Sequence, residues 1–566
     1  MFSSASKSVS SGGYSVKQSL RFRSSASAYL NRTFGTPTGA QKGTFSFWLK
    51  RGQIATDQEL MGAGASSYDQ FQFQSDQIRL VLNAAADGNL KTTAIFRDPS
   101  AWYHVVLSVD TTQATAANRA LIYVNGVSQA LTITTNITQN VSPKLFSNVI
   151  HYIGCYAGGT TTNNLDGYMA EVNFIDGQAL TPSSFGATNA TTGVWQPARY
   201  TGSYGTNGFY LTFSNTTSPT TLGYDFSGNS NNWTPNNIVS SQTIDYSIGI
   251  TTSGSSMDNS PTVIFNGSLA SWWGCGQNPS YNGTAILATA IPTSGFTVEV
   301  AAFASGSAIA GVTLYSSAGA SVYKAFSSTS SPYWQTFSAI SDIKQIKLSQ
   351  DGSGYGGMGI AAIRVNGVVI ATLRNVDAML DSPTNYDNGG NGVGNYAVLN
   401  PLDNSGITIA DGNLTCNQTG ADSMLRGTFG MSSGKWYWEA TLGNTKANIG
   451  IAKANAALSS YLGSDANGWG YYSLAGTKVN SGTTTAYGAT YTSGDVIGVA
   501  FDVDAGTLTF YKNNTSQGVA FTGLTSGPYF PAQGTSVSLQ YFNFGQRPFQ
   551  FSPPSGFKAL NTFNLP

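Results

Sequence analysis

The chain has 566 residues, a formal net charge of zero and only 10% charged residues. Its aromatic content of 12% supplies enough apolar area to exclude an intrinsically disordered chain. Lys and Arg form no basic cluster along the sequence, so we expect no nucleic-acid partner. A chain of this length predicts several domains.

The cysteines and the apolar segments argue against four further classes of protein: disulfide-rich, metal-binding, secreted and membrane-spanning. Cys155, Cys275 and Cys416 are odd in number and far apart, which predicts buried small side chains instead of a disulfide framework or a metal site. The N-terminal residues lack the apolar region of a secretory signal peptide, and no run is long enough for a membrane-spanning helix. We therefore expect synthesis in a cytoplasm without export by the general route, and no membrane insertion.

Short runs of alternating apolar and polar residues, separated by Gly, Asn, Asp and Ser turns, fill the chain from end to end. This alternation has the period of a β-strand, and no long stretch repeats with the helical period. The sequence therefore predicts an all-β, multi-domain chain of β-sandwiches. The expected segments are an N-terminal arm (1–17), a jelly roll (18–190), a connector (191–262), a middle sandwich (263–376), a second connector (377–405), a C-terminal sandwich (406–550) and a C-terminal tail (551–566).

The N-terminal arm is rich in Ser and Gly, a composition typical of a flexible chain. One interpretation is a frayed terminus. The other is an arm that becomes ordered when it docks on neighbouring proteins of a larger particle.

The segment after the arm has the strand pattern of a jelly roll. In GTFSFWLKRG, Phe45, Phe47 and Leu49 share one face, and RALIYVNGVSQAL turns at an Asn-Gly pair, a strong hairpin signal. With WYHVVLSVD and GYMAEVNFIDGQALT, these pieces resemble a laminin-G-like or concanavalin-A-like jelly roll. The resemblance implies a two-sheet sandwich that binds glycans or protein partners, in some members through calcium.

Two aspartates of this segment are the candidates for a calcium site. Asp166 and Asp176 each precede a glycine, and laminin-G-like sandwiches sometimes hold Ca²⁺ at a rim. Asp-Gly is first of all a turn dipeptide, so we favour the turn interpretation at both positions. No other cofactor is predicted.

The sequence predicts an inserted domain in the middle of the chain. The connector has little regular patterning, and SMDNSPT at 256–262 is echoed by MLDSPTNY at 379–386. Because Pro, Asp, Asn and Ser are turn residues, the two copies predict the start and the end of one domain. Between them, FTVEVAAF, AGVTLYS, IKQIKLS and GIAAIRVNGVVIATL predict a third β unit of no recognised family.

The C-terminal segment is organised around GDVIGVAFDVDAGTLTFYKNN, two alternating runs joined by a turn. SGKWYWEATL places Trp436 and Trp438 on one face. With GWGYYSLAGTKVNSG and a last strand ending in NFG, the series resembles a SPRY domain. The resemblance implies a β-sandwich that binds partners through its loops and has no catalytic chemistry. Asn513-Asn514 replaces the usual Asn-Gly turn, which Asn can occupy because it tolerates positive φ.

Glycan binding is the chemistry that the aromatic and amide content favours, because sugars stack on aromatic rings and pair with amides and hydroxyls. Trp272 and Trp273 are adjacent, so a strand points them to opposite faces and leaves one accessible. For every candidate a packing role is the alternative. The candidates for glycan or partner binding are Trp272, Trp273, Tyr281, Tyr355, Trp233, Trp469 and Tyr472.

Catalysis is not expected from the titratable residues. His104 and His151 are the only histidines, and His104 lies where the laminin-G-like pattern itself carries a histidine. HExxH and P-loop motifs are both missing from the sequence. A glycosidase needs two carboxylates that lie close together. Glu171, Glu299 and Glu439 lie in separate expected strands, and nothing in the sequence pairs any two of them.

The order of these segments resembles structural proteins of tailed bacteriophages. The resemblance implies a non-enzymatic virion surface protein, a tail fibre or capsid-attached fibre, that binds host surface glycans or proteins. Its N-terminal arm would contact other virion proteins, and we expect a symmetric homo-oligomer with a trimer as the first candidate. Two alternatives stay open, a purely architectural decoration or joining protein and a polysaccharide-cleaving tailspike, although no stacked β-helix repeat is present.

Overall fold

The computed structural model confirms the predicted all-β class. Strands predominate among the described residues, and the α-helix α1 (Pro219–Leu222) is a single turn. The described residues are 14–65, 67–156, 162–240, 246, 250–254, 259, 261–265, 269, 272–275, 282–305, 309–327, 329, 331–350, 357–365, 368–370, 375–387, 392–444 and 446–566. The 3₁₀ helices are η1 (Ser24–Ala26), η2 (Asn83–Ala85), η3 (Ala116–Asn118), η4 (Lys144–Phe146), η5 (Pro182–Ser184) and η6 (Pro261–Phe265).

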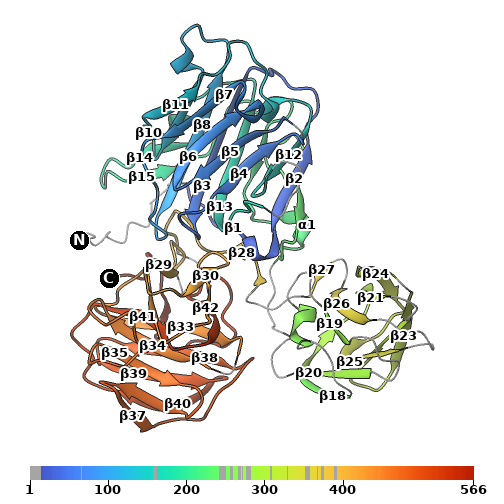
Figure 1. Cartoon of the computed structure of the whole chain (residues 1–566), viewed down its shortest axis with the longest axis vertical. Coiled ribbons are helices and arrows are strands. Elements are labelled where there is room, and N and C mark those ends of the chain that lie inside the picture. Colours follow the sequence, from blue (N-terminus) through green and yellow to red (C-terminus); the bar gives the residue numbers. More distant parts are fainter. Residues whose placement is uncertain are drawn as a thin grey trace. The chain divides into compact units, whose positions relative to one another are not determined.

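The chain divides into two compact units (Figure 1). Unit 1 combines Met1–Ile238 with Asp377–Pro566, and the middle unit is Val239–Val376. The middle unit is therefore an insertion, and both ends of the chain contribute to unit 1. The second copy of the sequence echo, 379–386, follows the end of this insertion at Val376, whereas the first copy, 256–262, lies inside the insertion, which begins at Val239.

The N-terminal sandwich of unit 1 has two eight-stranded sheets with antiparallel pairing. Sheet 1 contains, in order, β10 (Val127–Ser128), β9 (Ala120–Val124), β8 (Trp102–Asp110), β3 (Lys42–Arg51), β13 (Gly167–Asp176), β1 (Ser19–Phe22) and β28 (Ala378–Met379), with β16 (Phe209–Leu211) paired to β13. Sheet 2 contains β11 (Leu131–Thr135), β7 (Gly88–Thr92), β6 (Gln77–Leu82), β5 (Asp69–Gln74), β4 (Gln58–Ala63), β12 (Ile150–Ile153), β2 (Tyr29–Thr33) and β17 (Thr234–Asn236).

The core of this sandwich follows the alternation in β3. Phe45, Phe47 and Leu49 have no exposed surface, as their shared face predicts. Phe45 stacks on Phe174 of β13 with ring centroids 4.5 Å apart. Aromatic pairs of this kind stabilise the sandwich by burying large apolar areas.

Much of the expected connector belongs to unit 1. β15 (Trp195–Pro197) pairs with β14 (Gly186–Thr188), while β16 and β17 extend the two sheets. These strands have three residues each, too few for an alternating pattern to stand out in the sequence. The positions of β16 and β17 are set by pairing with strands that lie far away along the chain.

The C-terminal sandwich of unit 1 also has two sheets. Sheet 5 contains β29 (Leu399–Asn404), β32 (Met424–Gly427), β41 (Tyr529–Gly534), β34 (Asn448–Lys453), β35 (Gly468–Tyr472), β36 (Thr477–Asn480) and β37 (Thr483–Ala486). Sheet 6 contains β30 (Thr408–Ala410), β31 (Thr415–Gln418), β42 (Ser538–Asn543), β33 (Lys435–Leu442), β38 (Val496–Asp502), β39 (Thr507–Lys512) and β40 (Thr515–Phe521), with β43 (Lys558–Ala559) beside β33. The turn at Asn513-Asn514 has positive φ at both residues, as Asn permits.

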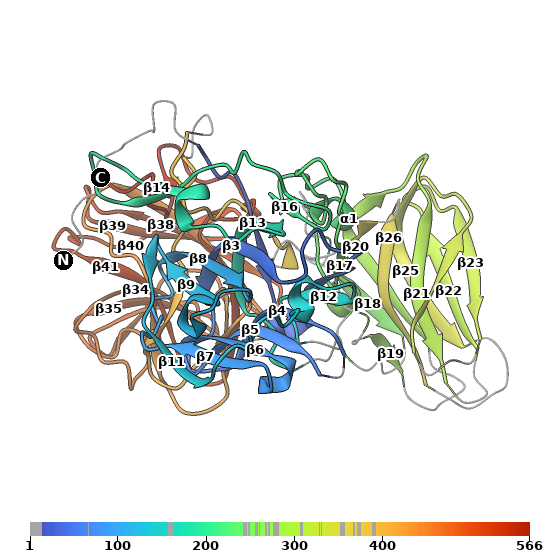
Figure 2. The ribbon, with the colours of Figure 1, turned by 90° about the horizontal axis from the view of Figure 1, so that it is seen from above.

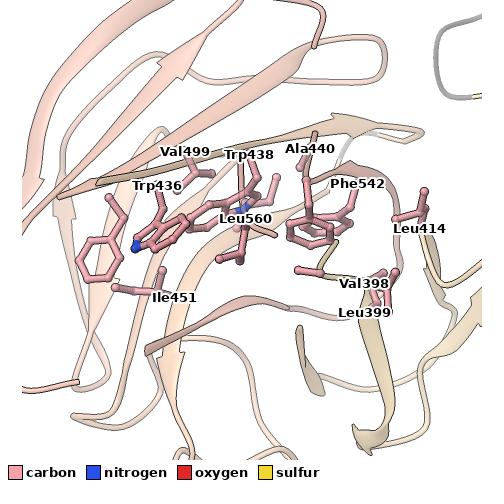
Figure 3. Packing of buried hydrophobic residues seen from close by; sticks show 14 of the residues in the cluster. Val398, Leu399, Leu414, Trp436, Trp438, Ala440, Ile451, Val499, Phe542 and Leu560 are labelled. Carbon is pink, nitrogen blue, oxygen red and sulfur yellow. The ribbon is translucent and has the colours of Figure 1, made fainter. Parts of the chain in front are cut away.

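Figure 3 shows how the core of this sandwich is filled. Trp436 and Trp438 lie side by side on β33, with Ile451, Val499 and Leu560 packed against the same cluster. Leu560 comes from the segment expected as a C-terminal tail, and it has no exposed surface. This segment is therefore part of the domain core.

The middle unit is a third sandwich (Figure 1; Figure 2). Sheet 3 contains β18 (Thr251–Gly254), β20 (Asn282–Pro292), β25 (Asp342–Gln350), β22 (Ala310–Tyr315) and β23 (Ser321–Phe326). Sheet 4 contains β19 (Trp273–Cys275), β26 (Met358–Val365), β21 (Val298–Ala304) and β24 (Tyr333–Phe337), with β27 (Val368–Val369) paired to β26. Aliphatic residues such as Val300, Val312 and Ile346 fill the space between the sheets.

The two sandwiches of unit 1 share a buried junction. Trp48, Trp102 and Tyr168 on the outer face of sheet 1 belong to the same apolar cluster as the core of the C-terminal sandwich. Residues 14–17 of the expected arm are described, and Val16 belongs to this cluster with 1% of its surface exposed. Residues 1–13 of that arm lie outside the described residues.

Among the residues that the structure describes, no helix has both the length and the apolar character needed to cross a membrane.

Candidate functional site

One face of the middle unit carries aromatic side chains on its two outer strands. It is the outer face of sheet 4, whose strands lie in the order β19, β26, β21 and β24. Alternate residues of β21 and β26, such as Val300 and Ile363, point into the core. The residues between them therefore form the outer face.

The two central strands supply a floor of small residues. Ala301 on β21 pairs with Ala362 on β26, and the pairing shifts at the next position, so Ala361 is an extra residue in β26. These three alanines are buried, and Trp334 of β24 packs over them. Because their side chains are single methyl groups, the floor lies below the rings at its edges.

Trp272 stands at one edge of the floor, directly before β19. Its side chain is 38% exposed, whereas its neighbour Trp273 is 1% exposed and packs in the core. The ring of Trp272 meets Phe303 edge to face, with centroids 5.0 Å apart. A Cβ at Gly359 would lie 2.4 Å from Cδ1 of Trp272, so only glycine at this position leaves room for the ring.

Trp334 stands at the other edge, next to an ion pair. The guanidinium carbon of Arg364 lies 4.3 Å from the Trp334 ring centroid, a cation–π contact. Arg364 also donates to both carboxylate oxygens of Glu299, from Nε at 2.5 Å and from Nη2 at 2.6 Å. The hydrogen bonds from Arg364 hold the pKa of Glu299 below its ordinary value. This pair thus stays charged and presents donors and acceptors beside an aromatic ring.

We call this face the aromatic trough. Three strand spacings separate its outer strands, roughly 14 Å in all. Its residues are Trp272, Phe303, Gly359, Ala301, Ala361, Ala362, Glu299, Arg364 and Trp334.

The trough has the chemistry of a binding site for a flat, polar ligand. Its rings offer stacking surfaces, and the Glu299–Arg364 pair offers hydrogen bonds in a fixed geometry. Glu299 is the only carboxylate on this face among the described residues, and Arg364 neutralises it. A glycosidase uses two carboxyl groups that flank the scissile bond, whereas Glu299 is a single carboxylate held in an ion pair with Arg364.

The other predicted aromatic residues are placed elsewhere. Trp233 is 2% exposed and packs against Phe34 and Phe209 in unit 1. Trp469 on β35 is partly buried against Tyr529, and Tyr472 at the end of the same strand is also partly buried. Tyr281 and Tyr355 lie outside the described residues. The structure therefore brings one residue of the predicted set, Trp272, into the trough.

Both candidate calcium ligands are buried acceptors of backbone hydrogen bonds. Asp166 accepts from the amides of Gly412 at 2.6 Å and Asp411 at 2.9 Å, which ties the two sandwiches of unit 1 together. Asp176 accepts from the amides of Thr38 and Asn207. Within the described ranges, no three His, Cys, Asp or Glu side chains come together as a metal-binding group.

The histidines have structural environments. His104 is 1% exposed, and its Nδ1 accepts from Nε1 of Trp195 while its Nε2 lies 2.9 Å from Oγ of Ser46. Burial lowers the pKa of His104 to about 3 and that of His151 to about 4. Both rings are therefore neutral at physiological pH and packed among other side chains.

The two cysteines whose side chains the structure describes are buried, as the sequence predicts. Cys155 and Cys416 are buried free thiols. The side chain of Cys275 lies outside the described residues.

Two features of the trough were missed by sequence reasoning. In YWQTF, Tyr333 and Phe337 pack toward the core, which leaves Trp334 as an aromatic residue at an outward-facing position. An aromatic residue at an outward-facing position of a strand is the signal from which Trp334 could have been predicted. The pairing of Glu299 with Arg364 left no such signal, because the two residues are 65 positions apart in the sequence.

Two families match parts of this chain. The SPRY domain family matches residues 435–547, and the concanavalin A-like lectin/glucanases superfamily matches residues 24–184. The chain carries a concanavalin-A-like domain and a SPRY domain. They occupy the N-terminal and the C-terminal sandwich of unit 1, so both domain resemblances in the sequence are confirmed.

The curated relatives share about a third of the chain. ATP-dependent RNA helicase DDX1 of Xenopus laevis is 28% identical over 216 residues, which are 37% of this chain and 29% of the helicase. Probable ATP-dependent RNA helicase ddx1 of Dictyostelium discoideum is 30% identical over 172 residues, 30% of this chain and 22% of the helicase. The chain thus spans less than a third of the length of these relatives. Among solved structures, the SPRY domain of human HERC1 is 18% identical with a TM-score of 0.25, and the match covers 27% of this chain and 99% of that domain.

These relatives correct the predicted function. The assignment as a bacteriophage tail fibre or capsid-attached fibre is wrong, because the matched relatives are named as RNA helicases. The two alternative assignments, a virion decoration or joining protein and a polysaccharide-cleaving tailspike, are wrong for the same reason. The order of sandwich motifs identifies domains, and one sandwich fold serves many unrelated functions. The virion location, the other virion partners and the trimeric homo-oligomer stay predictions.

Proposed function

We propose that this chain is a non-enzymatic carbohydrate-binding protein whose middle unit seats a sugar chain in the aromatic trough. The observation that carries the proposal is the placement of Trp272 and Trp334 at the two outer strands of sheet 4, with alanine and glycine between them. A polymer of flat sugar rings can lie across such a floor and meet a tryptophan at each side. The concanavalin-A-like and SPRY domains are candidates for binding a protein partner, the role that their families imply.

The interactions in the trough match the two surfaces of a sugar ring. The C–H face of a pyranose is apolar and stacks on an indole ring, as apolar groups do on aromatic side chains. The equatorial hydroxyls point outward and pair with charged donors and acceptors such as Arg364 and Glu299. The ion pair already fixes both side chains, so little side-chain entropy is lost on binding.

The expected affinity is modest. Each ring contact contributes about 1 kcal/mol, and each hydrogen bond about the same. The free energy that remains after the cost of association corresponds to a Kd on the order of a millimolar or somewhat lower. Tight binding would then come from several sites acting on one polysaccharide.

A glycan array probed with the full-length protein tests the proposal. We expect binding to at least one class of oligosaccharide, and loss of that signal in the Trp334→Ala variant. The matched control is Tyr323→Ala, because Tyr323 is a 49% exposed aromatic residue on sheet 3 of the same unit. An array on which the folded wild-type protein binds no glycan overturns the proposal. New reducing ends released from a bound polysaccharide would contradict the non-enzymatic role.

A further inference from the structure

A second candidate site lies in unit 1, independent of the aromatic trough. It is a cavity of about 240 Å³ in the concanavalin-A-like domain. A buried carboxylate, two cations and three aromatic rings meet at this cavity. The side chains that supply these groups are Tyr14, Lys17, Glu171, Arg199, Tyr210 and Phe226.

The charged groups of this cavity differ in their exposure. Glu171 is 7% exposed, whereas Lys17 and Arg199 are exposed. The carboxylate therefore lies at the floor of the cavity, and the two cations lie at its rim.

A β-bulge aims Glu171 into this cavity. On β13, Ala170 pairs with Trp48 and Asn173 pairs with Ser46, so β13 has one residue more than β3 between these pairs. Glu171 sits in this bulge with a φ of 53°, a conformation that side-chain-bearing residues rarely adopt. Bulges of this kind redirect a side chain, and strained backbone is common at binding sites.

The negative charge of Glu171 is stabilised by hydrogen bonds but by no ion pair among the described residues. The hydroxyl groups of Tyr14 and Tyr210 both donate to Oε2 of Glu171. Among the described residues, no Lys, Arg or His forms an ion pair with Glu171. Burial raises the pKa of Glu171, although the two hydroxyls and the charge of Arg199 act in the opposite direction. A buried carboxylate without a cation in contact costs free energy that a cationic ligand group would recover.

The rim has the opposite charge. Arg199 lies over the ring of Tyr210, with its guanidinium carbon 5.7 Å from the centroid. Lys17 and Arg199 are exposed and can move toward a bound anion. A simple anion would be repelled by Glu171 at the floor, and a simple cation would be repelled by the two rim cations. The charges therefore favour a ligand that carries both signs.

We propose that this cavity binds a free α-amino acid, with its ammonium group on Glu171 and its carboxylate on Lys17 and Arg199. The two charges of an α-amino acid are separated by one carbon atom, so both can be met within a cavity of this size. The ring of Phe226, which is 41% exposed, gives the side chain of the ligand an apolar surface. Apolar and aromatic amino acids are the preferred class.

Isothermal titration calorimetry with L-phenylalanine and the full-length protein tests this proposal. Phenethylamine lacks the carboxylate and hydrocinnamate lacks the ammonium group, so both analogues should bind about tenfold or more weakly. The Glu171→Gln variant removes one charge at almost constant size and should lose phenylalanine binding by a similar factor. The double variant Lys17→Ala/Arg199→Ala should lose the preference for phenylalanine over phenethylamine.

Lys558→Ala is the matched control, because Lys558 is exposed and belongs to the C-terminal sandwich. It should bind phenylalanine as the wild type does. Lys17 and Arg199 are exposed, so their variant stays informative even if Glu171→Gln fails to fold. The proposal is overturned if none of the standard amino acids binds at millimolar concentration, or if the double variant keeps the wild-type preference.

Discussion

Lys50 and Asp381 form an ion pair of 2.7 Å in which neither side chain has any exposed surface. Lys50 belongs to β3 of the concanavalin-A-like domain, and Asp381 belongs to the segment that leads into the SPRY domain. Lys50 also donates to Oδ1 of Asn395 and to the backbone oxygen of Tyr396, both at 2.7 Å. Trp102 Nε1 donates to the second oxygen of Asp381 at 3.0 Å. The two domains are therefore joined by a buried polar network as well as by apolar packing.

Asp381→Asn tests this junction. The substitution keeps an acceptor for Trp102 but removes the carboxylate partner of the buried Lys50 ammonium group, which should cost about 3–5 kcal/mol of unfolding free energy. Urea unfolding followed by tryptophan fluorescence measures the loss. The control is Lys435→Met, which breaks the Lys435–Asp502 pair, because the Lys435 side chain is 46% exposed and an exposed pair contributes less than about 1 kcal/mol. Equal small losses in the two variants would refute a structural role for the buried pair.

Asp166 should make unit 1 less stable as the pH rises from about 4 to about 6. Burial, with a contribution from nearby Asp411, raises the pKa of Asp166 to about 6. The unfolded value is about 4, so in this interval the folded state binds more protons than the unfolded state and its stability falls with rising pH. The full change amounts to about 3 kcal/mol.

Denaturant titrations of the wild type at several pH values should show this fall. A flatter profile in Asp166→Asn would assign the fall to this carboxyl group, because the amide does not titrate. An unchanged profile in the variant would exclude Asp166 as its source.

Leu560→Ala should destabilise the SPRY domain. Leu560 is fully buried among Trp436, Trp438 and their neighbours, so its truncation leaves a cavity in the core. The expected cost is about 2–5 kcal/mol. Leu565→Ala is the control, because Leu565 is only partly buried against the same cluster. Thermal unfolding followed by circular dichroism would count against this account if Leu560→Ala melted within a degree or so of the wild type.

Gly359→Ala should weaken sugar binding without removing any aromatic ring. The new methyl group would lie 2.4 Å from Cδ1 of Trp272 and 2.9 Å from Cε1 of Phe303, so the two rings must shift away from their packed positions. We expect a loss of about tenfold in affinity, measured by calorimetric titration and comparable with the loss of one ring contact. The control is Gly420→Ala, because a Cβ at Gly420 meets no atom within 4 Å. Wild-type affinity in Gly359→Ala would show that the position of Trp272 does not matter.

The sequence predicts features that depend on local geometry alone. Trp272 and Trp273 point to opposite faces because neighbouring side chains alternate in a strand, and this required no knowledge of the fold. Trp436 and Trp438 share a buried face for the same reason. The two domain families could also be identified, since each has several motifs in a fixed order.

Features that depend on sheet register could not be predicted in this way. The bulge at Glu171 is visible only when β13 is aligned with β3, because the local sequence continues to look like a strand. The Glu299–Arg364 pair and the docking of Leu560 join residues that are distant in the chain. The functional assignment failed for a related reason, because the order of domains does not determine what their surfaces bind.

The most direct test of carbohydrate binding is calorimetric titration of the wild type and of Trp272→Ala/Trp334→Ala with the oligosaccharide that gives the strongest array signal. Both rings lie on the outer face of sheet 4, so the double variant should keep the circular dichroism spectrum of the wild type. The account predicts measurable heat with the wild-type protein and none above background with the folded double variant. Equal affinity in the two proteins would contradict it.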